Sequence, residues 1–103
     1  MKKLVRLLVF LCLTGAVGFV HADDALLIKS NCLACHALDK RKYGPTFNEI
    51  ASKYANDGKA VEKLAKKIKV GGKGVWGDDE MPSQPNLSKA DALILAKHVL
   101  TLK

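Results

Sequence analysis

Three things are scarce in this chain of 103 residues: cysteine, methionine and any sign of β-structure. No segment alternates between apolar and polar residues as a half-buried strand does, and there is neither an internal repeat nor a low-complexity tract. The longest apolar run, residues 7–20, is shorter than the roughly 20 residues that a membrane-spanning helix needs. These absences argue against a sheet protein and against stable insertion into a membrane.

The N-terminus has the pattern of an export signal. Basic residues within residues 1–6 precede the apolar run, and small residues up to Ala22 follow it. The sequence therefore predicts a secretory signal peptide over residues 1–22, cleaved after Ala22, and a periplasmic mature protein of residues 23–103. An uncleaved anchor is the alternative, and Cys12, in the middle of the apolar run, is assigned to the signal.

The mature chain of 81 residues is one domain at most and is expected to be a monomer. At this size a core alone supplies only about 3–5 kcal/mol, so a cofactor or covalent staple is expected. Without the signal peptide, 14 basic residues face 10 acidic ones, a net charge of +4. This modest, evenly spread excess does not indicate nucleic-acid binding, but it fits a basic face for an acidic partner.

The two cysteines of the mature chain stand in a C-x-x-C-H pentapeptide, residues 32–36, which is the attachment signature for c-type haem. Residues three or four apart share a helix face, so Cys32 and Cys35 can both bond to one haem while His36 meets its iron. A redox-active dithiol is a weaker alternative, because it belongs in a βαβ context. A zinc site would have to recruit His98, and adjacent cysteine and histidine side chains diverge on a helix.

The second axial ligand follows from the residues that remain. The mature chain has one methionine, Met81, and only His98 besides the histidine of the motif. Met81 lies in a long Gly/Pro-rich loop, residues 71–87, which can fold over the haem, whereas His98 has apolar neighbours in a helical stretch. We therefore predict Met81 as the ligand. Methionine and histidine together raise the reduction potential and leave no open position, which favours an electron carrier over an enzyme. A haem catalyst or gas sensor with a labile sixth ligand is the alternative.

Apolar residues at helical spacing predict about four short helices, and hence an all-α fold. The first is expected to begin at a cap formed by Asp23-Asp24 and to lead into residue 32. The second opens at the capping-box spacing of residues 46–49 and runs to about residue 55. The third covers residues 60–68 and stops at a glycine pair, and the last runs from a cap at Ser88 to residue 102.

With these residues in place, the mature chain resembles the small bacterial class I cytochromes c of the cytochrome c-551/c-552 group. Besides the haem motif, the resemblance rests on segments in the same order: Gly44-Pro45, Ile68-Lys69-x-Gly71, Gly74-Val75-Trp76-Gly77, Met81-Pro82 and Leu95-Ala96-Lys97-x-Val99-Leu100. It implies the class I cytochrome c fold, with short helices wrapped around one covalently bound haem.

The resemblance also implies roles for single residues. The Pro45 carbonyl is expected to accept a hydrogen bond from the ligand histidine, and Trp76 to bond a haem propionate. A polar residue after the ligand methionine, Gln84 or Asn86, is expected to contact its sulfur. Lys67 stands where the family commonly has an arginine for the inner propionate, so it is a candidate only.

The partners that the resemblance implies are redox proteins: a cytochrome bc complex as donor, and a terminal oxidase, nitrite reductase or peroxidase as acceptor. Lysines around the exposed haem edge would steer such a partner. The candidates are Lys29, Lys42, Lys69 and Lys73.

Overall fold

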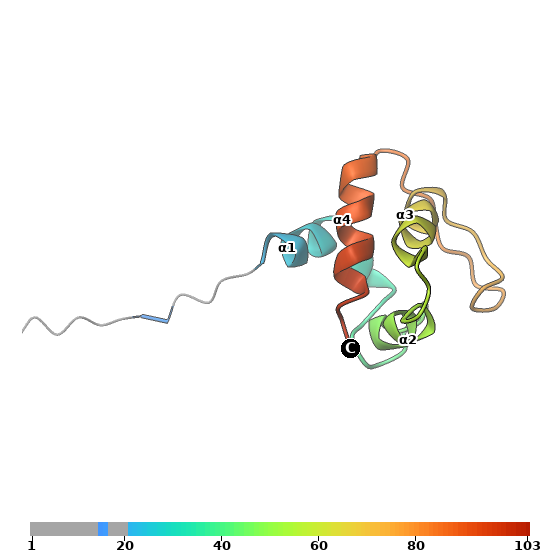
Figure 1. Ribbon diagram of the computed structural model, residues 1–103, viewed down its shortest axis with the longest axis horizontal. Helices are drawn as coiled ribbons and strands as arrows, with labels where there is room; N and C mark the ends of the chain where they lie inside the picture. Colours follow the sequence, from blue (N-terminus) through green and yellow to red (C-terminus); the bar gives the residue numbers. More distant parts are fainter. Residues whose placement is uncertain (1–14, 17–20) are drawn as a thin grey trace, which may run out of the picture.

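The computed structural model describes residues 15–16 and 21–103, so most of the expected signal peptide lies outside the described residues. The described chain forms α1 (Ala22–Lys29), the 3₁₀ turn η1 (Cys32–Ala34), α2 (Phe47–Lys53), α3 (Ala60–Val70) and α4 (Lys89–Val99) (Figure 1). The predicted all-α fold is confirmed, since its β-structure, as far as described, is a single isolated bridge. None of the described helices is long and apolar enough to cross a membrane.

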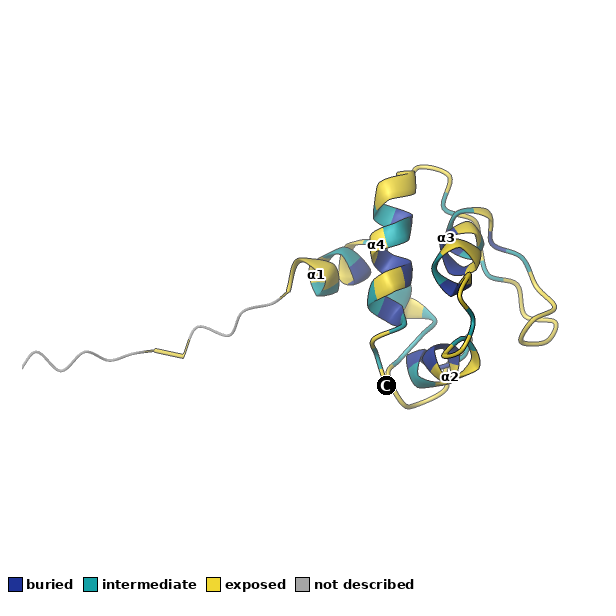
Figure 2. Cartoon of the chain, viewed as in Figure 1, coloured by how far each residue is buried: buried dark blue, intermediate teal, exposed yellow. Residues whose placement is uncertain are grey.

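Helix α4 is the centre of the packing. It contacts α1, α2 and α3, and Figure 1 shows it standing between α1 and α3. Ala92, Leu95 and Ala96 are fully buried, at the spacing of three and four residues that makes one helix face. Figure 2 shows the buried faces of the helices turned toward α4, while the loop between α3 and α4 is mostly exposed.

Two of the predicted helix starts are confirmed in detail. The Thr46 hydroxyl accepts from the Glu49 backbone N–H (3.0 Å), and the Glu49 carboxylate accepts from the Thr46 N–H (2.7 Å), which makes a capping box. At α4 the Ser88 hydroxyl accepts from the Asp91 N–H (3.0 Å). In both cases a short polar side chain satisfies a backbone donor that the helix leaves free.

The predicted first helix is partly wrong. Its cap position is His21, not the aspartate pair, and Asp23 and Asp24 lie inside the first turn. Carboxylates there still interact favourably with the positive end of the helix dipole. The helix also ends at Lys29 instead of leading into the haem motif, because Asn31 adopts a left-handed conformation (φ 60°) that breaks it.

The capping box gives a pH-dependent contribution to stability. The hydrogen bond from the Thr46 N–H, helped by Arg41 3.5 Å away, lowers the pKa of the exposed Glu49 carboxyl. A lowered folded pKa adds stability above the ordinary carboxyl pKa of about 4.3, and this is lost as the pH falls through the lowered value. We expect wild type to be more stable than Glu49→Gln near pH 7, with the difference shrinking toward pH 2–3. Urea unfolding at both pH values checks this, and an unchanged difference would contradict it.

Candidate cofactor site

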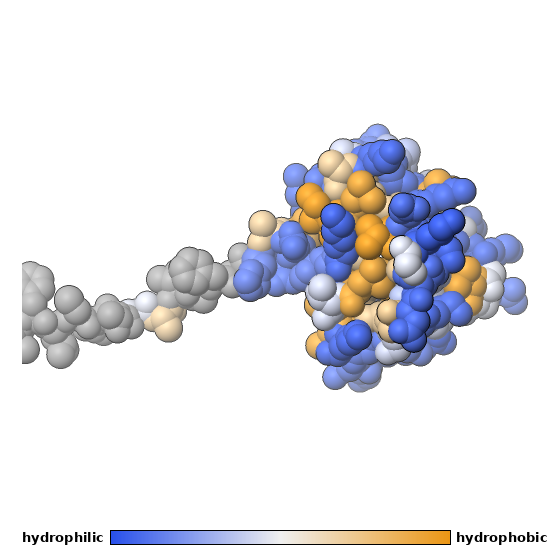
Figure 3. Space-filling model, in the orientation of Figure 1, coloured by the Kyte–Doolittle hydropathy of each residue, from blue (hydrophilic) through white to orange (hydrophobic). Residues whose placement is uncertain are grey.

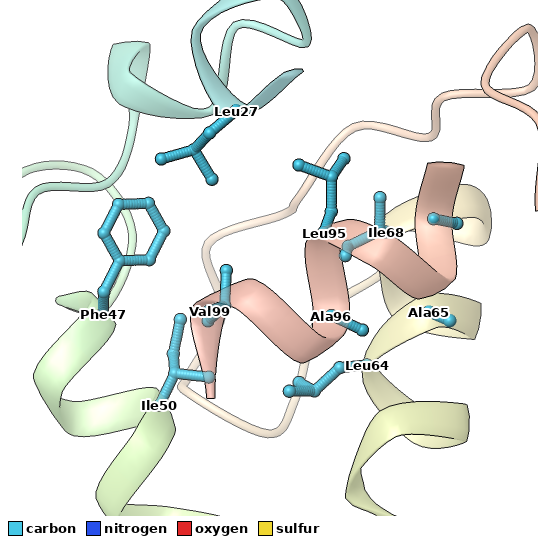
Figure 4. Packing of buried hydrophobic residues seen from close by; sticks show 10 residues of the cluster. Leu27, Phe47, Ile50, Leu64, Ala65, Ile68, Leu95, Ala96 and Val99 are labelled. Atoms are coloured by element: carbon cyan, nitrogen blue, oxygen red, sulfur yellow. The ribbon is translucent and has the colours of Figure 1, made fainter. Parts of the chain in front are cut away.

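A large, mostly apolar cleft runs through the middle of the protein. It encloses about 1110 Å³ between atoms, including the part open to solvent. Apolar side chains from all four helices line it: Leu27, Phe47, Ile50, Leu64, Ile68, Leu95, Ala96 and Val99. Figure 4 shows these side chains gathered around a common interior, and Figure 3 shows apolar surface reaching the exterior between polar flanks. An open cleft whose apolar wall is built from all four helices indicates a site for a bulky apolar ligand.

Both cysteines of the motif line this cleft from a single tight turn. The His36 N–H donates to the Cys32 carbonyl (3.0 Å), and the Cys35 N–H donates to the same carbonyl (3.3 Å). Cys32 and Cys35 are free thiols, each partly buried. Burial raises the pKa of the Cys32 thiol, although a hydrogen bond from its own backbone N–H opposes the rise. No disulfide joins Cys32 to Cys35, and both line one cleft.

The His36 ring is held in one orientation. Its Nδ1 lies 2.6 Å from the Pro45 carbonyl oxygen, and its ring stacks on Phe47 with centroids 5.5 Å apart. A carbonyl only accepts, so Nδ1 is the donor, and in the neutral ring this leaves the lone pair on Nε2. Among the described residues this is the ring's only hydrogen bond, and His36 lines the cleft. The ring is therefore prepared to bind a metal through Nε2.

Met81 reaches the same cleft from the loop between α3 and α4. Its backbone pairs with Gly72 through two hydrogen bonds, N–H to carbonyl in each direction, both 2.9 Å. Farther along, the Gln84 N–H donates to the Lys69 carbonyl (3.0 Å), and Lys69 Nζ donates to the Leu87 carbonyl (2.6 Å). The Met81 side chain is partly buried against the core. The loop is thus tied to the end of α3 at Met81 and at the residues that follow it.

The rim of the cleft holds the other residues expected from the sequence. Trp76 lines it while remaining 36% exposed, and Lys53 Nζ lies 5.3 Å from the centre of its ring, within range of a cation–π interaction. Lys67 and Lys73 also line the cleft.

Four other residues expected near the haem have different surroundings. Gln84 and Asn86 are not among the residues that line the cleft, and Asn86 is exposed. Lys42 donates to the Leu33 carbonyl (3.0 Å), and Lys29 lies in the last turn of α1.

His98 lies away from the cleft. Its Nε2 is 2.6 Å from the Asp24 carboxylate, and this pair joins α4 to α1 across 74 residues of sequence. In the part of the chain that the structure describes, no three His, Cys, Asp or Glu side chains are grouped so as to hold a metal ion. The alternative of a zinc site formed by the haem motif and His98 is therefore wrong.

The sequence reasoning missed other residues that line the cleft. Arg41, Tyr43, Tyr54 and Asp79 all line it. Tyr54 follows α2 by one residue and packs against the core, so its place at the end of a predicted helix was a usable signal. Tyr43 comes from an irregular loop, where no periodicity predicts which way a side chain points.

The chemistry of these groups fits a haem. The apolar wall suits a flat macrocycle, the two free thiols suit thioether bonds to its vinyl groups, and the unpaired Nε2 of His36 suits its iron. Gly44 packs so closely on His36 that a Cβ at this position would lie 2.6 Å from the ring carbon Cε1. The backbone is therefore shaped around the ring.

Comparisons with known proteins agree with this assignment. The family model described as "Cytochrome c" matches residues 24–103. The chain is 48% identical to cytochrome c-552 of Nitrosomonas europaea over 86 residues, 84% of each chain. It is 42% identical to cytochrome c-552 of Hydrogenobacter thermophilus over 103 residues, all of both chains. A crystal structure of the Nitrosomonas europaea cytochrome c552 superposes with a TM-score of 0.74, covering 77% of this chain and 98% of that one.

Proposed function

Because this chain belongs to the cytochrome c family, we propose that it is a periplasmic one-electron carrier whose haem iron is bound by His36 and Met81. As a cytochrome c it carries a covalently bound c-type haem and exchanges electrons with redox-protein partners. The match spans residues 24–103, which include every residue of the site described above.

The hydrogen bond between His36 Nδ1 and the Pro45 carbonyl is the observation that carries the proposal. At 2.6 Å it places a proton on Nδ1, so the lone pair of the neutral ring is on Nε2, the atom that would bind iron. Cys32 and Cys35, in the same turn, would hold the macrocycle through two thioether bonds. Trp76, on the rim of the cleft, would bond a propionate, with Lys67 as a second candidate.

Met81, which lines the same cleft as His36, would be the second protein ligand of the iron. When bound, the haem supplies one iron atom that gains or loses a single electron. As a ligand, the thioether of Met81 would favour the reduced state relative to other protein ligands and would keep oxygen and peroxide off the metal. The backbone pairing of Met81 with Gly72 supports this role, because it ties the segment that carries Met81 to the end of α3.

The compartment rests on the N-terminal pattern, and the partners rest on the family resemblance and the charge. Export through a cleaved signal peptide would bring residues 23–103 to the periplasm. A cytochrome bc complex would supply electrons, and a terminal oxidase, nitrite reductase or peroxidase would accept them. Lys73, on the rim of the cleft, is the strongest of the lysine candidates for steering an acidic partner, since Lys42 and Lys69 donate to backbone carbonyls.

Absorption spectra of the exported protein, produced with haem-attachment machinery, test the proposal. The oxidised wild type should show the red-edge band of sulfur bound to iron, and its mass should exceed that of the 81-residue chain by one haem. Met81→Ala should lose the band and bind carbon monoxide readily when reduced. His98→Ala is the matched control and should keep the band. A band that survives Met81→Ala would show that Met81 is not the ligand. Ready binding of carbon monoxide by untreated reduced wild type would favour a catalyst or gas sensor.

A further inference from the structure

Tyr43 and Glu80 join two loops at the rim of the cleft. The Glu80 backbone N–H donates to the Tyr43 hydroxyl at 3.2 Å, although the two residues are 37 apart in sequence. Tyr43 lines the cleft and is 54% exposed as a residue, so it lies at the boundary between the cleft and solvent. This bond connects the loop before α2 with the loop between α3 and α4.

Each end of this bond lies next to a proposed iron ligand. Tyr43 directly precedes Gly44-Pro45, the pair that packs on and orients His36. Glu80 directly precedes Met81. The Tyr43 hydroxyl therefore connects the backbone that supports one proposed ligand with the backbone that carries the other.

The part of the loop between α3 and α4 that precedes Met81 has few other interactions to hold it in place. Beyond Met81 the loop is tied to α3, as described above, but residues 78–80 are exposed. Among the described residues, the bond to Tyr43 is the only hydrogen bond made by residues 78–80. An exposed segment with a single tie opens easily, because few interactions oppose its motion.

We propose that Tyr43 is a positioning residue that keeps Met81 on the iron by holding Glu80 at the rim of the cleft. The inference rests on the proposed function, since it takes Met81 as the ligand. A hydrogen bond of ordinary net strength changes an equilibrium constant by roughly two- to tenfold. Loss of the hydroxyl should raise the population of the state in which Met81 has left the iron by this factor.

The rate of cyanide binding to the oxidised protein measures that population, because cyanide can bind only after Met81 leaves. Tyr43→Phe keeps the ring and removes the hydroxyl, and it should bind cyanide roughly two- to tenfold faster than wild type. Glu80→Gln changes the side chain but keeps the backbone N–H, so it should match wild type within about twofold.

Glu80→Pro removes the donor itself and completes a double-mutant cycle. If the hydroxyl acts through the Glu80 N–H, Tyr43→Phe should have no further effect on cyanide binding when combined with Glu80→Pro. A wild-type rate in Tyr43→Phe would overturn the proposal. So would a Tyr43→Phe effect that persists undiminished in the presence of Glu80→Pro.

Amide hydrogen exchange keeps the test informative if the proline variant folds poorly. Tyr43→Phe should speed exchange at the Glu80 amide while leaving the Ala92 amide, inside α4, unchanged. Unchanged exchange at Glu80 would overturn the proposal. A failure of the proposed function would give a different result from a failure of this proposal. Met81→Ala would keep the red-edge band, and exchange at the Glu80 amide would still respond to Tyr43→Phe.

Discussion

Replacing Gly71 with alanine is expected to lower the free energy of unfolding by about 2–6 kcal/mol and to remove the red-edge band of Met81. Gly71 follows the last residue of α3 with φ 69° and ψ −152°, a conformation essentially restricted to glycine. A Cβ there would also overlap the Met81 carbonyl oxygen and lie 2.8 Å from the Pro82 carbonyl carbon. Strain and overlap together would push away the segment that carries the proposed ligand.

Gly74→Ala is the matched control for this substitution. Gly74 also has a positive φ, 108°, but a Cβ there would meet nothing within 4 Å. It should therefore show the cost of backbone strain alone, about 1–3 kcal/mol, and keep the band. Urea unfolding and the absorption spectrum measure both effects. If the two variants lost the same stability and both kept the red-edge band, the close approach of Gly71 to Met81 would not matter.

Replacing Gly44 with alanine is expected to displace His36 and to lower the free energy of unfolding by about 2–4 kcal/mol. Besides its approach to Cε1, the new Cβ would lie 2.9 Å from Nδ1 and 3.2 Å from the Cys35 carbonyl oxygen. The ring cannot simply move aside, because Phe47 stacks on it. The predicted consequence is loss of the bond to Pro45, which NMR can follow through the Nδ1–H proton.

Gly58→Ala provides the comparison. Gly58 lies in the turn before α3, and a Cβ there would meet nothing within 4 Å. Since alanine restricts the unfolded chain, this variant should be unchanged or more stable by about 0.4–1 kcal/mol. If Gly44→Ala were equally harmless and kept the Nδ1–H signal, the backbone at Gly44 would not be what orients His36.

Local sequence predicted the helices well where a side chain bonds its own helix end. Thr46 and Ser88 begin α2 and α4 as expected, because the donors they satisfy are only three residues away. It predicted the first helix less well. The left-handed Asn31 ends α1 before the haem motif, and a polar residue in a short helix does not by itself reveal that conformation.

The sequence did not predict two side-chain contacts, because the residues that make them lie far apart in the chain. The contact between His98 and Asp24 joins residues 74 apart, and Tyr43 meets Glu80 across 37. Neither pair has a spacing that a helix or strand would produce. Only the packing of α1 on α4, and of the two loops around the cleft, brings these groups together.

The sequence alone determined the chemistry available to this protein: two thiols and an imidazole in one turn, a lone methionine in a distant loop, and helices with one apolar face. These follow from residue type and spacing, which act over a few residues. The tertiary structure decided which atoms meet in the cleft, including the Pro45 carbonyl at the His36 ring and the Tyr43 hydroxyl at Glu80. Those contacts depend on how the helices pack and where the loops close, and both are properties of the whole chain.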